Sequence, residues 1–145
     1  MNLYPVKLFK PCERINLKNI EFTEVGNKIY EAKSTLENYA KKNDVKIFFD
    51  LSKNNDNAEK LNIVVTDNNI LNINTFKTSV NPDINAVETV RVNDKLTSED
   101  TFLKRVFRGV SELTQKINKV RADRQADMIE TILAMETQRN LTCLL

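Results

Sequence analysis

The 145-residue sequence contains no histidine, and this absence removes a large part of enzyme chemistry. Histidine is the commonest general base, the usual partner of a serine or cysteine nucleophile, and a frequent ligand of zinc and iron. Carboxylates remain available, and Asp50 and Asp67 each close one of two neighbouring predicted strands. No pattern in the sequence brings these two side chains together. We therefore expect a protein that is not an enzyme.

Glycine and cysteine are also scarce. Gly26 and Gly109 are the two glycines of the chain, so it has neither a P-loop nor a GxGxxG turn to hold a phosphate. The two cysteines, Cys12 and Cys143, stand near opposite ends and form no CxxC pair, which excludes a zinc ribbon and a thioredoxin-like redox motif. The sequence therefore predicts no metal, no cofactor and no small-molecule substrate.

Long hydrophobic runs are missing as well. No run approaches the roughly 18 apolar residues that a membrane helix needs, and residues 1–7 lack the apolar segment of a secretory signal. We expect a protein that is neither secreted nor transmembrane, with its cysteines as free thiols in a reducing compartment.

Asparagine is present in excess. There are 19 asparagines, and 17 of them precede Asp94. This residue suits turns and is a poor choice for helix interiors, and its abundance is typical of an AT-rich genome. The net charge of +2 gives no general attraction to nucleic acid or anionic lipid. The chain thus divides into an Asn-rich front and an Asn-poor back.

The front begins with residues 1–24, which we interpret as an extended arm with a short strand at 15–22. This strand lies either at the edge of a sheet or on a partner. A helix is predicted over 27–42, because its apolar residues recur at 3-4-3 spacing: Ile29, Ala32, Leu36 and Tyr39. Gly26 and Asn27 would start it, and Asn43 and Asp44 would stop it.

Alternating apolar and polar residues then predict strands at 45–51, 61–66 and 70–78, separated by Asn-rich loops and turns. In the third strand Leu71, Ile73 and Thr75 are expected on one side and Phe76 on the other. A fourth strand is predicted at 87–92. The fold class is α+β, with a small antiparallel meander of three to four strands packed against an N-terminal helix and a long C-terminal helix.

The C-terminal stretch 97–139 is helical in pattern, with no proline and one glycine. Thr97 and Asp100 resemble a capping box at its start. Six apolar residues repeat at 3-4-3-4-3 spacing and predict a seam that covers the sheet: Leu103, Val106, Val110, Leu113, Ile117 and Val120.

Beyond Val120 this seam gives way to a second apolar stripe. Its strongest members are Met128, Ile129, Ile132, Leu133 and Met135, with Ala122 and Ala126 beside them. The second stripe is rotated by roughly 110–120° about the helix axis from the first. Either the helix bends near 119–124, or the second stripe contacts something other than the sheet. We favour a contact with another subunit over an intramolecular fold-back.

Basic residues gather on the face opposite the first seam: Lys104, Arg105, Arg108, Lys116 and Lys119. This face is either a solvated surface or a contact for nucleic acid or an acidic protein.

Together these patterns predict a 1–24 arm, a 25–120 α+β core and a 121–145 helical extension for intersubunit contact. We expect a non-catalytic structural or assembly subunit that binds other protein subunits in a homo- or hetero-oligomer and does not bind membranes. The Asn-rich composition and missing catalytic residues suggest a virion component of a virus or phage, located in the cytoplasm or the virion. The alternative is a nucleic-acid-binding or packaging accessory that uses the basic face.

Overall fold

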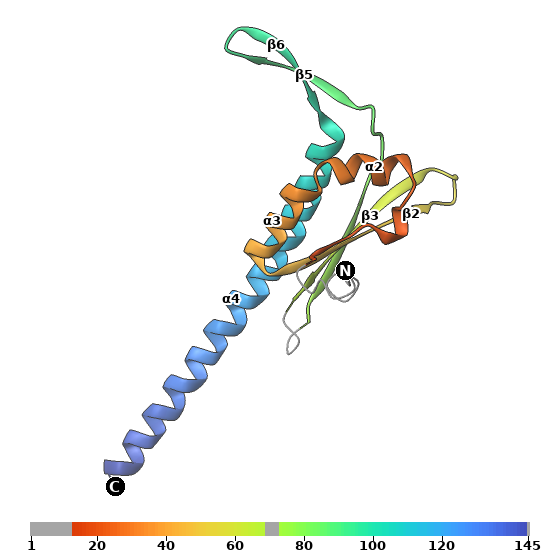
Figure 1. Cartoon of the computed structure of the whole chain (residues 1–145). Helices are drawn as coiled ribbons and strands as arrows, with labels where there is room; N and C mark the ends of the chain where they lie inside the picture. The colour runs from red at the N-terminus through yellow and green to blue at the C-terminus, as the bar shows by residue number, and fades with distance from the viewer. Residues whose placement is uncertain (1–12, 69–72, 145) are drawn as a thin grey trace, which may run out of the picture.

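A computed structural model describes residues 13–68 and 73–144 of the chain, with side chains as far as Asn140 (Figure 1). The fold is α+β, as predicted. The first half of the predicted N-terminal arm (residues 1–12, including Cys12) and the predicted strand start at 70–72 lie outside the described residues. In chain order the elements are β1 (Ile15–Asn16), η1 (Lys18–Ile20), α2 (Glu24–Glu31), α3 (Lys33–Asn43), β2 (Val45–Lys53), β3 (Glu59–Asp67), β4 (Thr75–Val80), β5 (Val87–Val92), β6 (Lys95–Asp100) and α4 (Thr101–Leu144).

The main sheet has the strand order β1-β2-β3-β4. The meander β2-β3-β4 is antiparallel, as predicted, but β1 adds a parallel edge that makes the sheet mixed. Only Ile15 and Asn16 pair in β1, opposite Ile47 and Phe48 of β2. The predicted strand over 15–22 is therefore too long. The chain turns into η1 instead, and this turn buries Ile20.

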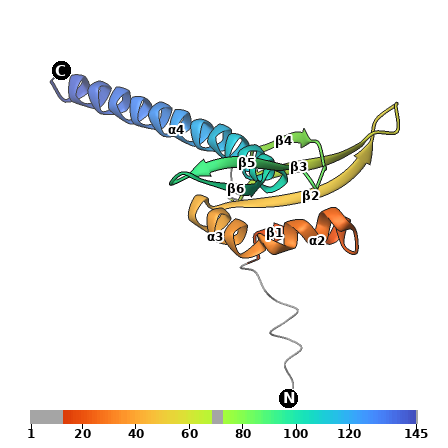
Figure 2. The ribbon, with the colours of Figure 1, turned by 90° about the horizontal axis from the view of Figure 1, so that it is seen from above.

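One face of the sheet forms the core. Alternate residues of β2 and β3 are buried on it, namely Val45, Ile47, Phe49, Leu61, Ile63 and Val65. They join side chains of α2, α3 and α4 in one hydrophobic cluster. In Figure 2, α2 and α3 lie on the side of β1 and β2, while α4 lies on the side of β4. The other face of the sheet carries exposed or half-buried residues such as Lys46 and Asn62.

Thr75 and Phe76 lie on opposite sides of the third strand, as predicted, and Phe76 is on the side that faces the core. Phe76 lies opposite the buried Val65 and packs against the core, whereas Ile73 is 66% exposed. The strand begins at Thr75, and pairing with β3 sets which residues face inward. Since the side-chain period of a strand is two, pairing from this start places the even-numbered residues on the core face.

The single helix predicted over 27–42 is two helices. The hydroxyl of Thr23 caps α2 by accepting a hydrogen bond of 2.9 Å from the Gly26 N–H, so the helix begins at Glu24 rather than at Asn27. The helix is interrupted at Ala32, where φ is −102° and ψ is 8°. A Cβ atom at Gly26 would overlap the carbonyl oxygen of Ile20, so this glycine serves close packing of α2 on η1. The predicted stop at Asp44 is confirmed.

The C-terminal helix begins later than predicted. Residues Lys95–Asp100 form β6, which pairs with β5 in a separate hairpin. Asn93 and Asp94 connect the strands with φ values of 51° and 64°, as a two-residue hairpin turn requires. The predicted fourth strand thus exists but does not pair with the main sheet among the described residues. Asp100, rather than Thr97, caps α4 by accepting a 3.1 Å hydrogen bond from Leu103 N–H.

Candidate interaction surface

The first half of α4 belongs to the core. The predicted seam residues Val106, Val110, Leu113 and Ile117 are buried, together with Phe102. Leu103 packs at the margin of the cluster and Val120 is half-buried. A Cβ added at Gly109 would lie 3.1 Å from Cδ1 of Ile63, which shows how closely the helix approaches the sheet. This half of α4 therefore serves the fold of its own chain.

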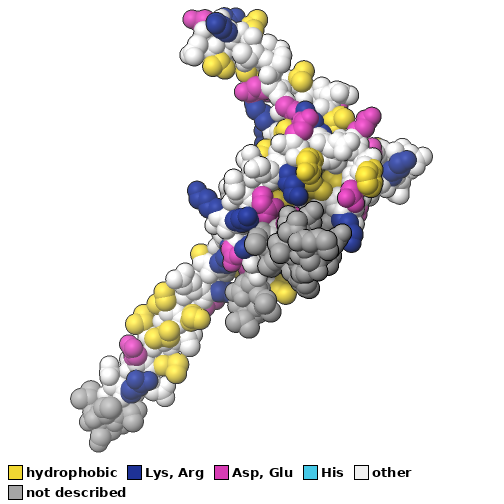
Figure 3. All heavy atoms as spheres, in the orientation of Figure 1, with side chains coloured by type: hydrophobic (Ala, Val, Ile, Leu, Met, Phe, Trp, Pro, Cys, Tyr) yellow, Lys and Arg dark blue, Asp and Glu magenta, His cyan; other side chains and the backbone are white. Residues whose placement is uncertain are grey.

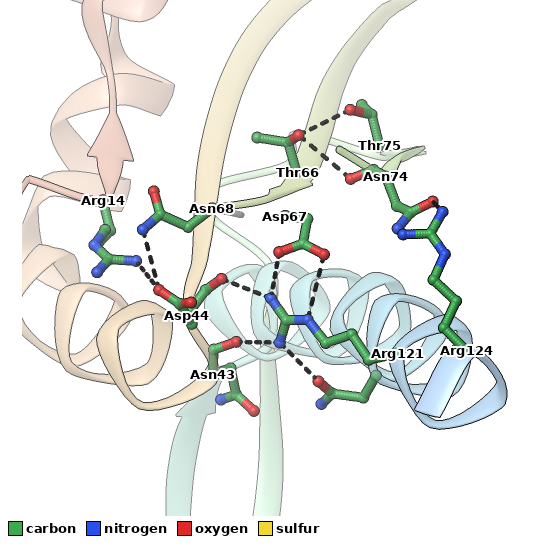
Figure 4. Close-up of polar contacts among 11 residues, drawn as sticks. Arg14, Asn43, Asp44, Thr66, Asp67, Asn68, Asn74, Thr75, Arg121 and Arg124 are labelled. Carbon is green, nitrogen blue, oxygen red and sulfur yellow. Dashed lines mark hydrogen bonds and ion pairs between the residues drawn. The ribbon is translucent and has the colours of Figure 1, made fainter. Parts of the chain in front are cut away.

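Arg121 marks the end of the buried half (Figure 4). Its guanidinium donates to both carboxylate oxygens of Asp67 at the end of β3, with Nη2 to Oδ1 at 2.7 Å and Nε to Oδ2 at 3.3 Å. It also donates to the backbone carbonyls of Asn43 and Asp44 at 2.7 Å each. Carbonyls at a helix C-terminus lack intrahelical partners, so Arg121 ties α4 to the ends of both α3 and β3.

Asp44 extends this junction toward the N-terminal part of the chain. Its Oδ1 accepts hydrogen bonds from Arg14 at 2.9 Å and from Asn68 at 3.1 Å. These two bonds, that from Arg14 first, hold the pKa of the Asp44 carboxyl below its ordinary value. Asp44 also adopts a left-handed backbone conformation, with φ of 53° and ψ of 51°, which ends α3.

Beyond the junction α4 continues as one helix away from the sheet (Figure 1). No bend or fold-back interrupts it between residues 101 and 144. Every residue from Ala122 to Asn140 is exposed. The stretch 122–140 is called the tail below, and at 1.5 Å per residue it spans roughly 28 Å.

The tail carries the second apolar stripe entirely in solvent. Its five large members, here called the distal stripe, have the following exposed fractions: Met128 63%, Ile129 51%, Ile132 49%, Leu133 56% and Met135 59%. Figure 3 shows these hydrophobic side chains gathered along the distal part of α4. Isolated exposed apolar residues are normal, but a continuous row of them on one helix is characteristic of a binding surface.

The five predicted basic residues do not form one free row. Lys104 pairs with Glu99, Arg105 donates to the carbonyl oxygen of Asp83 at 3.0 Å, and the Lys116 ammonium lies 5.9 Å from the centre of the Phe76 ring. Arg108 and Lys119 are exposed, and neither forms an ion pair with a residue that the structure describes. Three of the five are thus engaged within the chain.

The structure also separates the two carboxylates that close the predicted strands. Asp50 is exposed and lies opposite Asn62 within the strand pair, whereas Asp67 is buried opposite Val45 at its end. Within 13–68 and 73–144, no cluster of three or more potential metal-ligating side chains occurs. No helix in these ranges is long and apolar enough to cross a membrane.

Sequence reasoning missed two features of this surface. It assigned no role to Arg121, although Arg121 is the residue that joins α4 to the ends of α3 and β3. It also made nothing of Phe22, which is 93% exposed. No local sequence pattern marks Arg121 or Phe22, because the role of each depends on backbone segments that are distant in the sequence.

No protein-family model matches the chain, and neither the curated proteins nor the solved structures contain a match to it.

Proposed function

We propose that the protein is a non-catalytic assembly subunit that binds another protein subunit through the distal stripe of α4. One observation supports this most strongly: five large apolar side chains lie in a continuous row on a part of α4 that its own core does not cover. Helical pairing of this kind uses apolar residues at i, i+3, i+4 and i+7 as anchors. Ile129, Ile132 and Leu133 occupy the first three of these positions, and Met128, Ile132 and Met135 share the spacing i, i+4 and i+7. The Met side chains can adapt to an irregular partner.

The continuous helix favours this role. Helix nucleation is costly, but propagation from an existing helix is not. The buried half of α4 provides the nucleus, and the Arg121 junction holds the base of the tail against the core. The tail is therefore presented as a preformed helix, which lowers the conformational cost of binding.

The energies indicate that the stripe needs a complementary surface. Complete burial of one Leu, Ile or Met side chain contributes about 1.5–3 kcal/mol, so five half-exposed residues offer roughly 5 kcal/mol per chain. Association costs on the order of 4–15 kcal/mol. A stable complex thus requires further apolar or charged contacts from the partner.

The proposal is tested by substitutions that keep the helix and change the stripe. Ile129→Gln with Leu133→Gln places a good helix former at two stripe positions. The matched control, Ala134→Gln, alters the opposite side of the same turns. Sedimentation velocity on the wild-type protein should show species larger than the monomer. The stripe variant should be monomeric, and the control should behave as the wild type. A wild-type protein that stays monomeric excludes binding between identical copies, and a stripe variant that associates as the wild type does contradicts the proposal.

The kind of assembly rests on composition alone. The excess of asparagine and the missing catalytic residues support a component of a viral or phage particle, in the cytoplasm or the virion. The nucleic-acid alternative has less support, because three of the five basic residues are engaged within the chain. Binding to DNA or RNA that weakens steeply with salt would favour the alternative instead.

A further inference from the structure

We propose that the distal stripe of one copy docks in a groove on the core of a second copy, so that identical chains join head to tail. This inference rests on the function proposed above and adds the partner and the receiving site. The groove has a volume of about 550 Å³ and is formed by β1, η1, α2 and β2.

Phe22 is the first observation that singles out this groove. Its side chain lines the groove and is 93% exposed, and its backbone is left-handed, with φ of 66°. A side chain with a Cβ atom is strained in this conformation, and Gly or Asn would fit the turn better. The fold therefore gains nothing from an aromatic residue here. Such an unfavourable position is a reason to infer a contact function.

Tyr30 supplies a second aromatic ring at the same groove. It is 64% exposed, and the ammonium of Lys33 lies 5.6 Å from its ring centre. Aromatic residues are enriched at protein interfaces because they bury a large area with little loss of side-chain freedom. The two rings provide the additional apolar contact that the distal stripe requires.

The charges of the two surfaces are complementary. Four cations line the groove against two anions: Arg14, Lys18, Lys33 and Lys46 against Glu13 and Glu21. Arg14 also pairs with Asp44, and Lys33 lies 3.9 Å from Glu13, so Lys18 and Lys46 are the cations that carry the excess. The tail has the reverse excess, with four anions against two cations: Asp123, Asp127, Glu130 and Glu136 against Arg124 and Arg139. Opposite charges accelerate association and disfavour wrong partners.

Two other pairings fit less well. Two tails that bound each other would bring together surfaces of the same net charge. In a parallel pair of tails, Glu136 of one chain would also lie beside Glu136 of the other, because Glu136 is only about 20° from Ile129 around the helix. The hairpin β5–β6 also exposes Val87, Val92 and Leu96, but its strands contain more acidic than basic residues. Only the groove combines exposed aromatic rings with an excess of cations within the part of the chain that the structure describes.

The contact must form between copies. The groove lies on the core, while α4 carries the stripe away from it as an unbroken helix (Figure 1). A surface that binds a different surface of an identical chain generates rings or open chains rather than a closed two-fold dimer. Assembly should therefore grow beyond the dimer as the protein concentration rises.

The decisive experiment mixes two variants. Phe22→Asn removes the ring from the groove but keeps the left-handed turn and the stripe, and Ile129→Gln with Leu133→Gln removes the stripe but keeps the groove. Each alone should be monomeric in sedimentation velocity, with an apparent Kd at least tenfold weaker than the wild type. An equimolar mixture should form a 1:1 complex that cannot grow, because each partner retains one half of the contact.

Other results overturn this inference and separate it from the proposed function. If Phe22→Asn assembles as the wild type does while the stripe variant is monomeric, the groove is not the receiving site. The stripe then binds another tail or a different site. If both variants are monomeric and their mixture is also monomeric, the head-to-tail contact is wrong. If the stripe variant assembles normally, both proposals fall.

A charge reversal tests the electrostatic part of the contact. Lys46→Glu changes a cation of the groove, and Lys53→Glu makes the same change on an exposed residue of the same strand outside it. We expect Lys46→Glu to weaken assembly severalfold and Lys53→Glu to leave it unchanged. Equal effects of the two variants would show that general charge, rather than the groove, governs assembly.

Discussion

Replacement of Arg121 by alanine should destabilise the protein more than any other removal of a single charge on α4. Its guanidinium forms two hydrogen bonds with Asp67, whose side chain is 2% exposed, and two with carbonyl oxygens at the end of α3. Removing one partner of a buried ion pair costs about 3–5 kcal/mol. Because 31% of the Arg121 side chain is exposed, water replaces part of this interaction, and we expect a loss of about 2–4 kcal/mol.

Equilibrium unfolding in urea measures this loss as a lower midpoint with an unchanged slope. Arg124→Ala is the matched control, since Arg124 lies one turn away and its side chain makes, among residues 13–68 and 73–144, a single long hydrogen bond of 3.4 Å with Asn74. Its effect should stay within about 0.5 kcal/mol. A cycle with Asp67→Asn should give a coupling energy of about 1 kcal/mol or more between the two residues. If Arg121→Ala is no more destabilising than Arg124→Ala, the junction does not hold α4 as described.

Three further predictions concern the core and its junctions. Gly26→Ala should lower the free energy of unfolding by about 1–3 kcal/mol, because its methyl group would overlap the Ile20 carbonyl. Gly109→Ala should be nearly neutral in the same urea assay, because its methyl group would meet side-chain ends alone, at 3.1 Å from Ile63 and 3.4 Å from Thr78, and alanine favours the helix. The lowered pKa of Asp44 contributes stability that is present above the ordinary carboxyl pKa of about 3.9 and is lost as the pH falls through the lower folded-state value. Asp44→Asn, which the left-handed backbone tolerates, should therefore lose less stability than the wild type in urea midpoints between pH 5 and pH 2.5, and an equal loss would contradict the assignment. Phe22→Asn should raise the urea midpoint, because it relieves the left-handed strain, and a lower midpoint would show that the ring supports the fold.

The predicted and observed folds agree where the pattern repeats. Val45, Ile47 and Phe49 alternate with polar residues and are buried, and Val106, Val110 and Leu113 recur at helical spacing and are buried. Each additional repeat supports the same face, so one misplaced residue does not change the result. The second stripe also repeats at helical spacing. Because it is rotated around the helix away from the first seam, a straight helix cannot place both stripes against the sheet.

The errors fall where a distant contact decides between two local possibilities. Residues 97–100 resemble a helix start, but pairing with β5 makes them a strand and leaves Asp100 as the cap. The inward side of β4 follows from its register with β3. The local sequence pattern cannot predict either the strand at 97–100 or the inward side of β4, because both depend on the neighbouring strand with which the segment pairs.

The sequence by itself determined the elements with repeated periodicity, the α+β class, and the presence of a second apolar stripe beyond the core-forming seam, because periodicity is a property of neighbouring residues. Only the tertiary structure decided that α4 is one helix, that the stripe stays in solvent, and that Arg121 joins α4 to α3 and β3. It alone placed Phe22 in a left-handed turn at the edge of a groove lined by an excess of cations. These features depend on packing between residues far apart in the chain, whose relative positions no local pattern specifies.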